Sequence, residues 1–111
     1  MNDIERLIHA WRSHVEEYAA AKAEHEYLKE FRKSKKAILM CKYEQQGEKV
    51  ASTREAKAYA DPEYLELLEG LRAATEKSES LRYRMTIAQT RVDVWRTQEA
   101  NSRRERNNYN A

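Results

Sequence analysis

The sequence contains almost none of the residues that break helices or form tight turns. Its 111 residues include two glycines and one proline. Hairpins between strands need Gly, Asn-Gly or Pro at their corners, so this scarcity argues against a β-sheet protein. The length is sufficient for one domain. Long, uninterrupted helices are therefore the expected building blocks.

Long apolar stretches and paired cysteines are missing as well. No segment approaches the roughly 18–20 consecutive apolar residues that span a bilayer, so we expect no membrane contact. Asp3, Glu5 and Arg6 interrupt the first residues of the chain, which argues against a secretory signal there. The one cysteine, Cys41, cannot form an internal disulfide, and a reducing cytoplasm is the simplest expected location.

Charge is abundant, at 36% of residues beside 41% hydrophobic residues. Such a composition is typical of long helices that share a narrow apolar seam. The net charge is only +2, but segments alternate in sign: residues 1–28 and 61–80 are acidic, whereas residues 29–42 and 81–111 are basic. Antiparallel pairing of a first and a last helix would place each acidic segment beside a basic one.

Apolar residues three, four or seven positions apart predict a first helix of about 40 residues. Asn2 or Asp3 can cap its start, and nothing interrupts it before Gly47. The residues expected in its seam are Ile4, Leu7, Ile8, Trp11, Val15, Tyr18, Leu28, Phe31, Ile38 and Leu39. A short second helix is expected from Ser52, because Ser52 and Glu55 have the spacing of a capping box.

Asp61 and Pro62 form the clearest helix start in the chain, since Asp caps free N–H groups and Pro suits a first turn. The helix that follows, to about Asn101, has a heptad pattern typical of a coiled coil. One heptad position holds Tyr64, Leu71, Ser78, Met85 and Val92, and the other holds Leu67, Ala74, Leu81, Ala88 and Trp95. Residues 103–111 lack periodicity, and we expect a basic, disordered tail there.

These patterns predict an all-α fold: a long antiparallel helical hairpin, coiled-coil-like, with a short connecting helix, in one domain over residues 1–102. Two helices make a thin core, so we expect the hairpin to assemble into a homo-oligomer. The candidate residues of the core seam and the oligomer contact are Trp11, Leu71, Leu81, Met85, Val92 and Trp95.

Residues for catalysis or metal binding do not form a set. Zinc needs three or four ligands, and the three histidines are too far from Cys41 in sequence to complete one locally. Glu66 with Glu69, and Glu76 with Glu79, have the Glu-x-x-Glu spacing of magnesium-dependent nucleotide pyrophosphohydrolases. They fall outside the heptad and are expected in solvent, whereas a magnesium site needs converging oxygens. We expect no enzyme activity, metal or cofactor, with such a hydrolase as an alternative.

The feature with the most functional content is a basic run with aromatic neighbours. Single-stranded nucleic acid is held by cations along its phosphates and by aromatic rings stacked on its bases. The predicted nucleic-acid-binding residues are Lys29, Arg32, Lys33, Lys35, Lys36, Lys42, Tyr43, Arg54 and Lys57, continued by Lys49 and Tyr59. A second contact is offered by Arg103, Arg104, Arg106 and Tyr109. The alternative is that the basic run pairs within the chain with Asp61, Glu63, Glu66 and Glu69.

Two sets of motifs in residues 28–103 resemble a known family. The first is Lys35-Lys36-Ala37-Ile38-Leu39, followed by Lys42-Tyr43 and Gly47. The second comprises Arg54-Glu55-Ala56-Lys57-Ala58, Asp61-Pro62-Glu63-Tyr64, Leu71-Arg72-Ala73-Ala74 and Arg91-Val92-Asp93-Val94-Trp95-Arg96. These stretches resemble the UvsY-like recombination mediators, small helical phage proteins encoded near recombination genes.

The resemblance implies an oligomeric, non-enzymatic mediator in the host cytoplasm. Such a protein binds single-stranded DNA, loosens the single-strand-binding protein and helps load a recombinase or annealing protein. It implies Lys35, Lys36 and Lys42 as DNA contacts. The alternative function is a helical protein-interaction module without nucleic-acid binding, such as a phage inhibitor of a host factor or an assembly scaffold.

Overall fold

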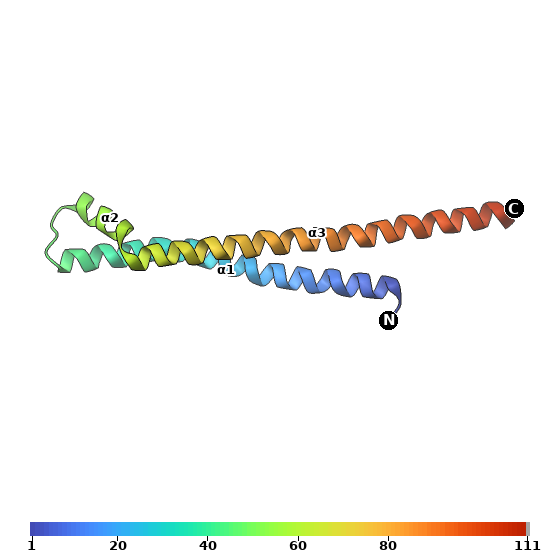
Figure 1. Ribbon diagram of the computed structural model, residues 1–111, viewed down its shortest axis with the longest axis horizontal. Helices are drawn as coiled ribbons and strands as arrows, with labels where there is room; N and C mark the ends of the chain where they lie inside the picture. Colours follow the sequence, from blue (N-terminus) through green and yellow to red (C-terminus); the bar gives the residue numbers. More distant parts are fainter. Residues whose placement is uncertain (111) are drawn as a thin grey trace. The chain divides into compact units, whose positions relative to one another are not determined.

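The computed structural model describes residues 1–110, and within them the chain forms three helices. These are α1 (Asp3–Gln45), α2 (Ala51–Ala60) and α3 (Pro62–Asn110). Two compact units are formed: a terminal unit of Met1–Ala19 with Glu79–Ala111, and a turn unit of Ala20–Ser78. In each unit a segment of α1 and a segment of α3 run side by side in opposite directions (Figure 1). The predicted all-α hairpin with a short connecting helix is confirmed.

The predicted helix caps are present at the starts of α1 and α3. The Glu5 N–H donates to Asn2 Oδ1 at 2.9 Å, and the Asn2 N–H donates to the Glu5 carboxylate at 3.3 Å. This reciprocal pair is a capping box. At the start of α3 the Glu63 N–H donates to Asp61 Oδ1 at 2.8 Å, with Pro62 in the first turn. Both caps satisfy N–H groups that have no partner within the helix.

The start of α2 differs from the prediction. The helix begins at Ala51, and Val50 precedes it in an extended conformation without a side-chain hydrogen bond. The predicted capping box of Ser52 and Glu55 is therefore wrong. The Glu55 carboxylate instead accepts a hydrogen bond from the Lys36 ammonium of α1 at 3.1 Å. A partner from another helix thus replaces the local one.

The end of α1 is a left-handed turn at Gly47, which has a φ of 98°. The Gly47 N–H donates to the Glu44 carbonyl oxygen and the Glu48 N–H donates to the Tyr43 carbonyl oxygen, both at 3.0 Å. These two bonds define a Schellman motif. The stop predicted at this glycine is confirmed.

Gly47→Ala is expected to lower the free energy of unfolding by about 1–2 kcal/mol, because a Cβ is disfavoured in the left-handed region. Gly70 is the matched control, since it lies within α3 and a Cβ there would meet no atom within 4 Å. Gly70→Ala is expected to raise the free energy of unfolding by about 0.5–1 kcal/mol. Urea unfolding followed by circular dichroism measures both. A Gly47→Ala chain as stable as wild type would contradict this helix end.

The heptad predicted for α3 is confirmed at every position. All ten predicted residues are buried or half-buried. Among the other described residues of α3 from Gly70 onward, only Arg82 and Glu99 are not exposed. The period of 3.5 residues in this sequence therefore determines which face of α3 is covered.

Seven of the ten residues predicted for the seam of α1 are buried or half-buried, Phe31 among them, and three are exposed. Ile8, Val15 and Ile38, predicted in the seam, are 36%, 40% and 55% exposed. Six of the predicted residues belong to an unbroken buried or half-buried series with alternating steps of three and four residues: Ile4, Leu7, Trp11, His14, Tyr18, Ala21, His25, Leu28, Arg32, Lys35 and Leu39. The regular heptad of α3 selects the facing positions of α1 by their spacing, and four of these positions hold polar residues.

α3 continues through Asn110, beyond the predicted end near Asn101. Residues 103–110 are helical and exposed where a disordered tail was predicted; residue 111, the last of that predicted tail, lies outside the described residues. The reason is local. No Gly or Pro follows Gly70, and arginine and glutamate are good helix formers that offset the asparagines.

The buried core of each unit is small. The largest side chains that are fully buried are Leu39 in the turn unit and Val92 in the terminal unit. Leu39 of α1 packs with Ala58 of α2 and Tyr64 of α3. This cluster joins the three helices of the turn unit and positions the candidate site beside it.

Candidate nucleic-acid interface

The three helices of the turn unit surround a hollow of about 410 Å³. α1 contributes Arg32, Lys33 and Lys36, α2 contributes Tyr59, and α3 contributes Tyr64. Cations and aromatic rings are the two kinds of group that hold single-stranded nucleic acid, at its phosphates and at its bases. The hollow combines both kinds of group within one unit.

Lys36 and Tyr59 form the centre of this hollow. The Lys36 Nζ lies 4.7 Å from the centroid of the Tyr59 ring and 3.1 Å from the Glu55 carboxylate. Both contacts favour the ammonium form and hold the pKa of Lys36 above 10.5, with Tyr59 making the largest contribution and Glu55 the second largest. The Tyr59 and Tyr64 rings meet edge to face with centroids 5.3 Å apart. Tyr59 is 41% exposed, so part of its ring is open to a ligand.

Arg32 and Lys33 are less engaged within the chain. Lys33 pairs with Glu30 of the same helix at 3.4 Å, and the two side chains are 70% and 68% exposed. Exposed pairs of this kind are weak and are screened by salt. Arg32 forms no ion pair with any residue of the described chain. A phosphate can therefore approach both cations without first displacing a buried partner.

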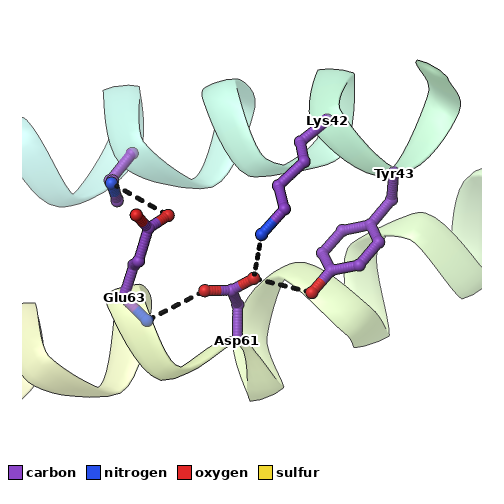
Figure 2. Close-up of polar contacts among 5 residues, drawn as sticks. Lys42, Tyr43, Asp61 and Glu63 are labelled. Carbon is purple, nitrogen blue, oxygen red and sulfur yellow. Dashed lines mark hydrogen bonds and ion pairs between the residues drawn. The ribbon is translucent and has the colours of Figure 1, made fainter. Parts of the chain in front are cut away.

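A second polar cluster of the turn unit centres on Asp61, which is 2% exposed. Its carboxylate accepts hydrogen bonds from the Tyr43 hydroxyl at 2.6 Å and the Lys42 ammonium at 3.2 Å, besides its cap to Glu63 (Figure 2). These donors, with Tyr43 the largest contributor, hold the pKa of Asp61 below 3.8. The carboxylate in turn raises the pKa of Tyr43 above 10.0 and the pKa of Lys42 above 10.5. The cluster ties the end of α1 to the start of α3.

The remaining basic residues of the run also have partners. Lys35 pairs with the Glu63 carboxylate at 3.4 Å. Lys57 pairs with the Glu48 carboxylate at 3.0 Å and holds the pKa of Glu48 below 4.5. The Arg54 guanidinium donates to the Glu48 carbonyl oxygen at 3.0 Å. Pairing within the chain, the alternative use of the basic run, therefore occurs at several of its lysines.

The structure divides the nine predicted nucleic-acid-binding residues by their surroundings. The hollow brings together Arg32, Lys33 and Lys36, of which Lys33 and Lys36 also pair with Glu30 and Glu55. The residues engaged by contacts within the chain and outside the hollow are Lys35, Lys42, Tyr43, Arg54 and Lys57. Lys29 is exposed one turn before Lys33 and extends the same side of α1. Tyr64 also lines the hollow, although the sequence pattern predicted it only as a seam residue. The signal for it was the pair of tyrosines on either side of the Asp61-Pro62 helix start.

The six candidate residues of the core seam and the oligomer contact are all buried or half-buried. Leu81 and Val92 are buried, and Trp11, Leu71, Met85 and Trp95 are half-buried. Val92 has no exposed surface, so its contacts lie within the hairpin. A contact of the tryptophans with another copy of the chain stays a prediction.

The carboxylates with Glu-x-x-Glu spacing are exposed, as predicted. Glu69 and Glu79 each bind the arginine three residues further along α3, Arg72 and Arg82, at 2.9 and 2.8 Å. Within residues 1–110, no three His, Cys, Asp or Glu side chains are grouped closely enough to hold a metal ion. None of the described helices combines the length and the apolarity needed to cross a bilayer.

In comparisons with known proteins, no family model, no curated protein and no solved structure matches this chain. The function must therefore be inferred from the residues of the chain itself. Among them, the hollow of the turn unit brings three cations together with the exposed ring of Tyr59.

Proposed function

We propose that this protein binds single-stranded nucleic acid and acts as a recombination mediator that helps load a recombinase or annealing protein on single-stranded DNA. The binding proposal is carried by one observation, the convergence of Arg32, Lys33 and Lys36 with Tyr59 and Tyr64 on one hollow. The mediator role is supported by the resemblance to UvsY-like proteins. It entails a homo-oligomer in the host cytoplasm, with a recombinase and a single-strand-binding protein as partners.

The proposed contact uses two kinds of interaction. A backbone phosphate lies against Arg32, which has no ion pair within the described chain, and against Lys33, whose pair with Glu30 is exposed. A base stacks on the exposed part of Tyr59, an interaction that contributes about 1–3 kcal/mol per base in proteins of this kind. Phosphates and aromatic faces are common to all four bases. Binding is therefore independent of sequence and sensitive to salt.

The neighbouring ion pairs position the hollow in this proposal. Asp61 holds the start of α3 against Lys42 of α1, and Tyr64 follows three residues later. The bond from Lys36 to Glu55 holds α2 in the same way. Lys42 accordingly acts as a positioning residue, although the family resemblance implies it as a DNA contact.

The double variant Arg32→Gln, Lys33→Ala is expected to bind fluorescein-labelled oligo-dT about tenfold more weakly at low salt, because phosphate contacts and their counterion release are lost. The slope of log affinity against log salt should fall by about 0.7 for each phosphate contact removed from a single strand. Tyr59→Ala is expected to bind at least about fivefold more weakly with an unchanged slope, because it removes stacking and not charge. Fluorescence anisotropy across a salt series measures the affinity of each variant and the slope of its salt dependence.

Lys77→Ala is the matched control, because it removes one exposed lysine elsewhere in the turn unit. Its affinity should stay close to that of wild type. Lys42→Ala should unfold more easily while its folded form binds oligo-dT as wild type does. An unchanged affinity in the Arg32, Lys33 double variant, or an equal loss in Lys77→Ala, would contradict binding at the hollow.

A helical protein-interaction module without nucleic-acid binding is the second candidate function. It is favoured by the number of lysines whose charge is already used: Lys35, Lys36, Lys42 and Lys57 each contact a carboxylate. This candidate predicts that the wild-type chain leaves the anisotropy of labelled oligo-dT unchanged even at low salt. The same titration therefore separates the two functions.

A further inference from the structure

α1 carries a second apolar stripe within the turn unit, separate from its seam. The stripe consists of Tyr27, Phe31, Ile38 and Cys41, with Ser34 in its middle. At about 100° per residue, these five positions fall within an arc of about 80° on the helix. Tyr27 and Ile38 are 61% and 55% exposed, and Cys41 is exposed. The Tyr27 and Phe31 rings stack with centroids 5.9 Å apart.

We infer that two copies of the chain pair through this stripe, with their α1 helices antiparallel about Ser34. A two-fold contact needs a surface that is complementary to itself, and a stripe centred on a small residue meets this requirement. Phe31 then lies opposite Ile38 of the second copy, and Tyr27 lies opposite Cys41 of the second copy. A shallow hollow of about 440 Å³ bounded by Ile38 and Cys41 offers room for that tyrosine ring.

The charges beside the stripe favour the antiparallel arrangement. Glu24 precedes Ser34 by ten residues and Lys42 follows it by eight, and both lie on the same flank of the stripe. Antiparallel pairing therefore places Glu24 of one copy within about 3 Å, along the axis, of Lys42 of the other. Parallel pairing would instead place the flanks that carry these charges on opposite sides of the contact, so that neither charge meets the other. Lys42 remains 45% exposed in its pair with Asp61, so it can take a second carboxylate.

The chain exposes more surface than a compact protein of its mass. The accessible surface is 8408 Å², whereas a compact monomer of this mass would expose roughly 6,400 Å². The difference of roughly 2,000 Å² per chain compares with the 1,200–2,000 Å² in total that a stable interface buries. The stripe, with Tyr27 and Ile38 at 61% and 55% exposed, is one part of this additional surface.

This inference rests on the homo-oligomer of the proposed function and names its contact. It places the contact on the Tyr27–Cys41 stripe instead of on Trp11 and Trp95, which are half-buried in the terminal unit. Lys36 lies two residues from Ile38, about 200° around the helix. The nucleic-acid hollow therefore stays open in the dimer. Two hollows on one particle strengthen binding to a strand long enough to reach both.

Light scattering over a concentration series tests the contact in the absence of nucleic acid. The wild-type chain is expected to have twice the monomer mass. Ile38→Glu and, independently, Tyr27→Glu are expected to halve it, because each places a carboxylate in the stripe. Leu65→Glu is the matched control: it introduces the same charge at a leucine of α3 that is 49% exposed, and it should remain a dimer. A monomeric wild-type chain, or a dimer that persists in both stripe variants, would overturn the inference.

Disulfide trapping tests the direction of pairing. In the antiparallel dimer the two Cys41 residues are about 21 Å apart along the helix axis, so mild oxidation should leave the wild type without a cross-link. Ser34→Cys in a Cys41→Ser background should form a covalent dimer, because the two sulfurs meet at the two-fold axis. Rapid cross-linking through Cys41 of the wild type would contradict the antiparallel arrangement.

The two proposals fail separately in these experiments. If Ile38→Glu is monomeric and still binds a short oligo-dT with wild-type affinity, the result supports both the nucleic-acid-binding proposal and the dimer contact. A dimer that dissociates in Ile38→Glu, in a chain that never binds oligo-dT, overturns the proposed function and leaves the contact intact. Oligo-dT binding with the particle mass unchanged in both stripe variants overturns the contact and leaves the function intact.

Discussion

Replacing Leu39 with alanine is expected to lower the free energy of unfolding by about 2–5 kcal/mol. Leu39 is 1% exposed and packs between Ala58 of α2 and Tyr64 of α3. Its loss leaves a cavity in a cluster that has few other buried residues to close it. Small domains have about 5–15 kcal/mol of stability in total, so this substitution removes a large fraction of it. Urea unfolding followed by circular dichroism measures the change.

Leu65→Ala is the control for this prediction. It makes the same substitution in the same unit at a leucine that is 49% exposed, and its effect should stay within about 1 kcal/mol. Hydrogen exchange should locate the loss in Leu39→Ala at the amides of the turn unit, where the cluster joins the three helices. Equal destabilisation by the two substitutions would mean that Leu39 is not the centre of a core.

The seam of α3 could be predicted from the sequence because apolarity and spacing agree there. Its heptad runs from Tyr64 to Trp95 with one polar member, Ser78. Each predicted position is covered in the structure. The period identifies the buried face even though Tyr83, Ile87 and Val94 lie outside it, where they are 59%, 53% and 49% exposed.

The seam of α1 could not be predicted in the same way because two apolar stripes compete there. Leu28 and Leu39 belong to the seam, whereas Tyr27 and Ile38 form the exposed stripe, one residue away in each case. Apolarity alone does not choose between neighbouring stripes. The choice is made by the partner helix, whose heptad covers His25, Arg32 and Lys35 at seam positions despite their polarity.

The candidate site shows the same division between local and long-range information. The cations of α1 and the tyrosines around Asp61 and Pro62 are visible in the sequence. Which lysines face the hollow depends on where α2 packs, and that is set by contacts between Lys36 and Glu55 that lie 19 residues apart. Local signals such as the caps at Asn2 and Asp61 were therefore predictable, whereas the capping box at Ser52 was displaced by a more distant partner.

Asp61→Ala is expected to lower the melting temperature by about 5–10 °C, because the substitution removes a helix cap and leaves two donors unpaired. The Glu63 N–H loses its acceptor at the start of α3. The Tyr43 hydroxyl and the Lys42 ammonium lose the carboxylate that joins them to α3. Differential scanning calorimetry measures the change. Glu66→Ala is the matched control, since Glu66 is an exposed carboxylate of the same helix.

The charge of Asp61 should also make stability depend on pH, in a direction that its pKa determines. In the folded chain the pKa of Asp61 is below 3.8. The ionised carboxylate therefore stabilises the fold fully above pH 3.8, and this stabilisation is lost as the pH falls through the pKa of the folded state. The pKa values of Tyr43 and Lys42 are raised above 10.0 and 10.5. Their stabilisation is complete below those values and is lost as the pH rises through the higher folded ones. A plateau of stability should therefore extend between the acid and alkaline limits.

Asp61→Asn separates the charge from the cap, because asparagine also caps helices but does not titrate. At neutral pH this variant should retain more stability than Asp61→Ala. On the acid side its free energy of unfolding should fall less steeply than that of wild type, because the lost carboxylate no longer takes up a proton on unfolding. On the alkaline side Tyr43 loses the largest cause of its raised pKa, so the free energy of unfolding should likewise fall less steeply as the pH rises. Parallel acid limbs in wild type and Asp61→Asn would show that Asp61 is not the carboxylate that holds α1 to α3.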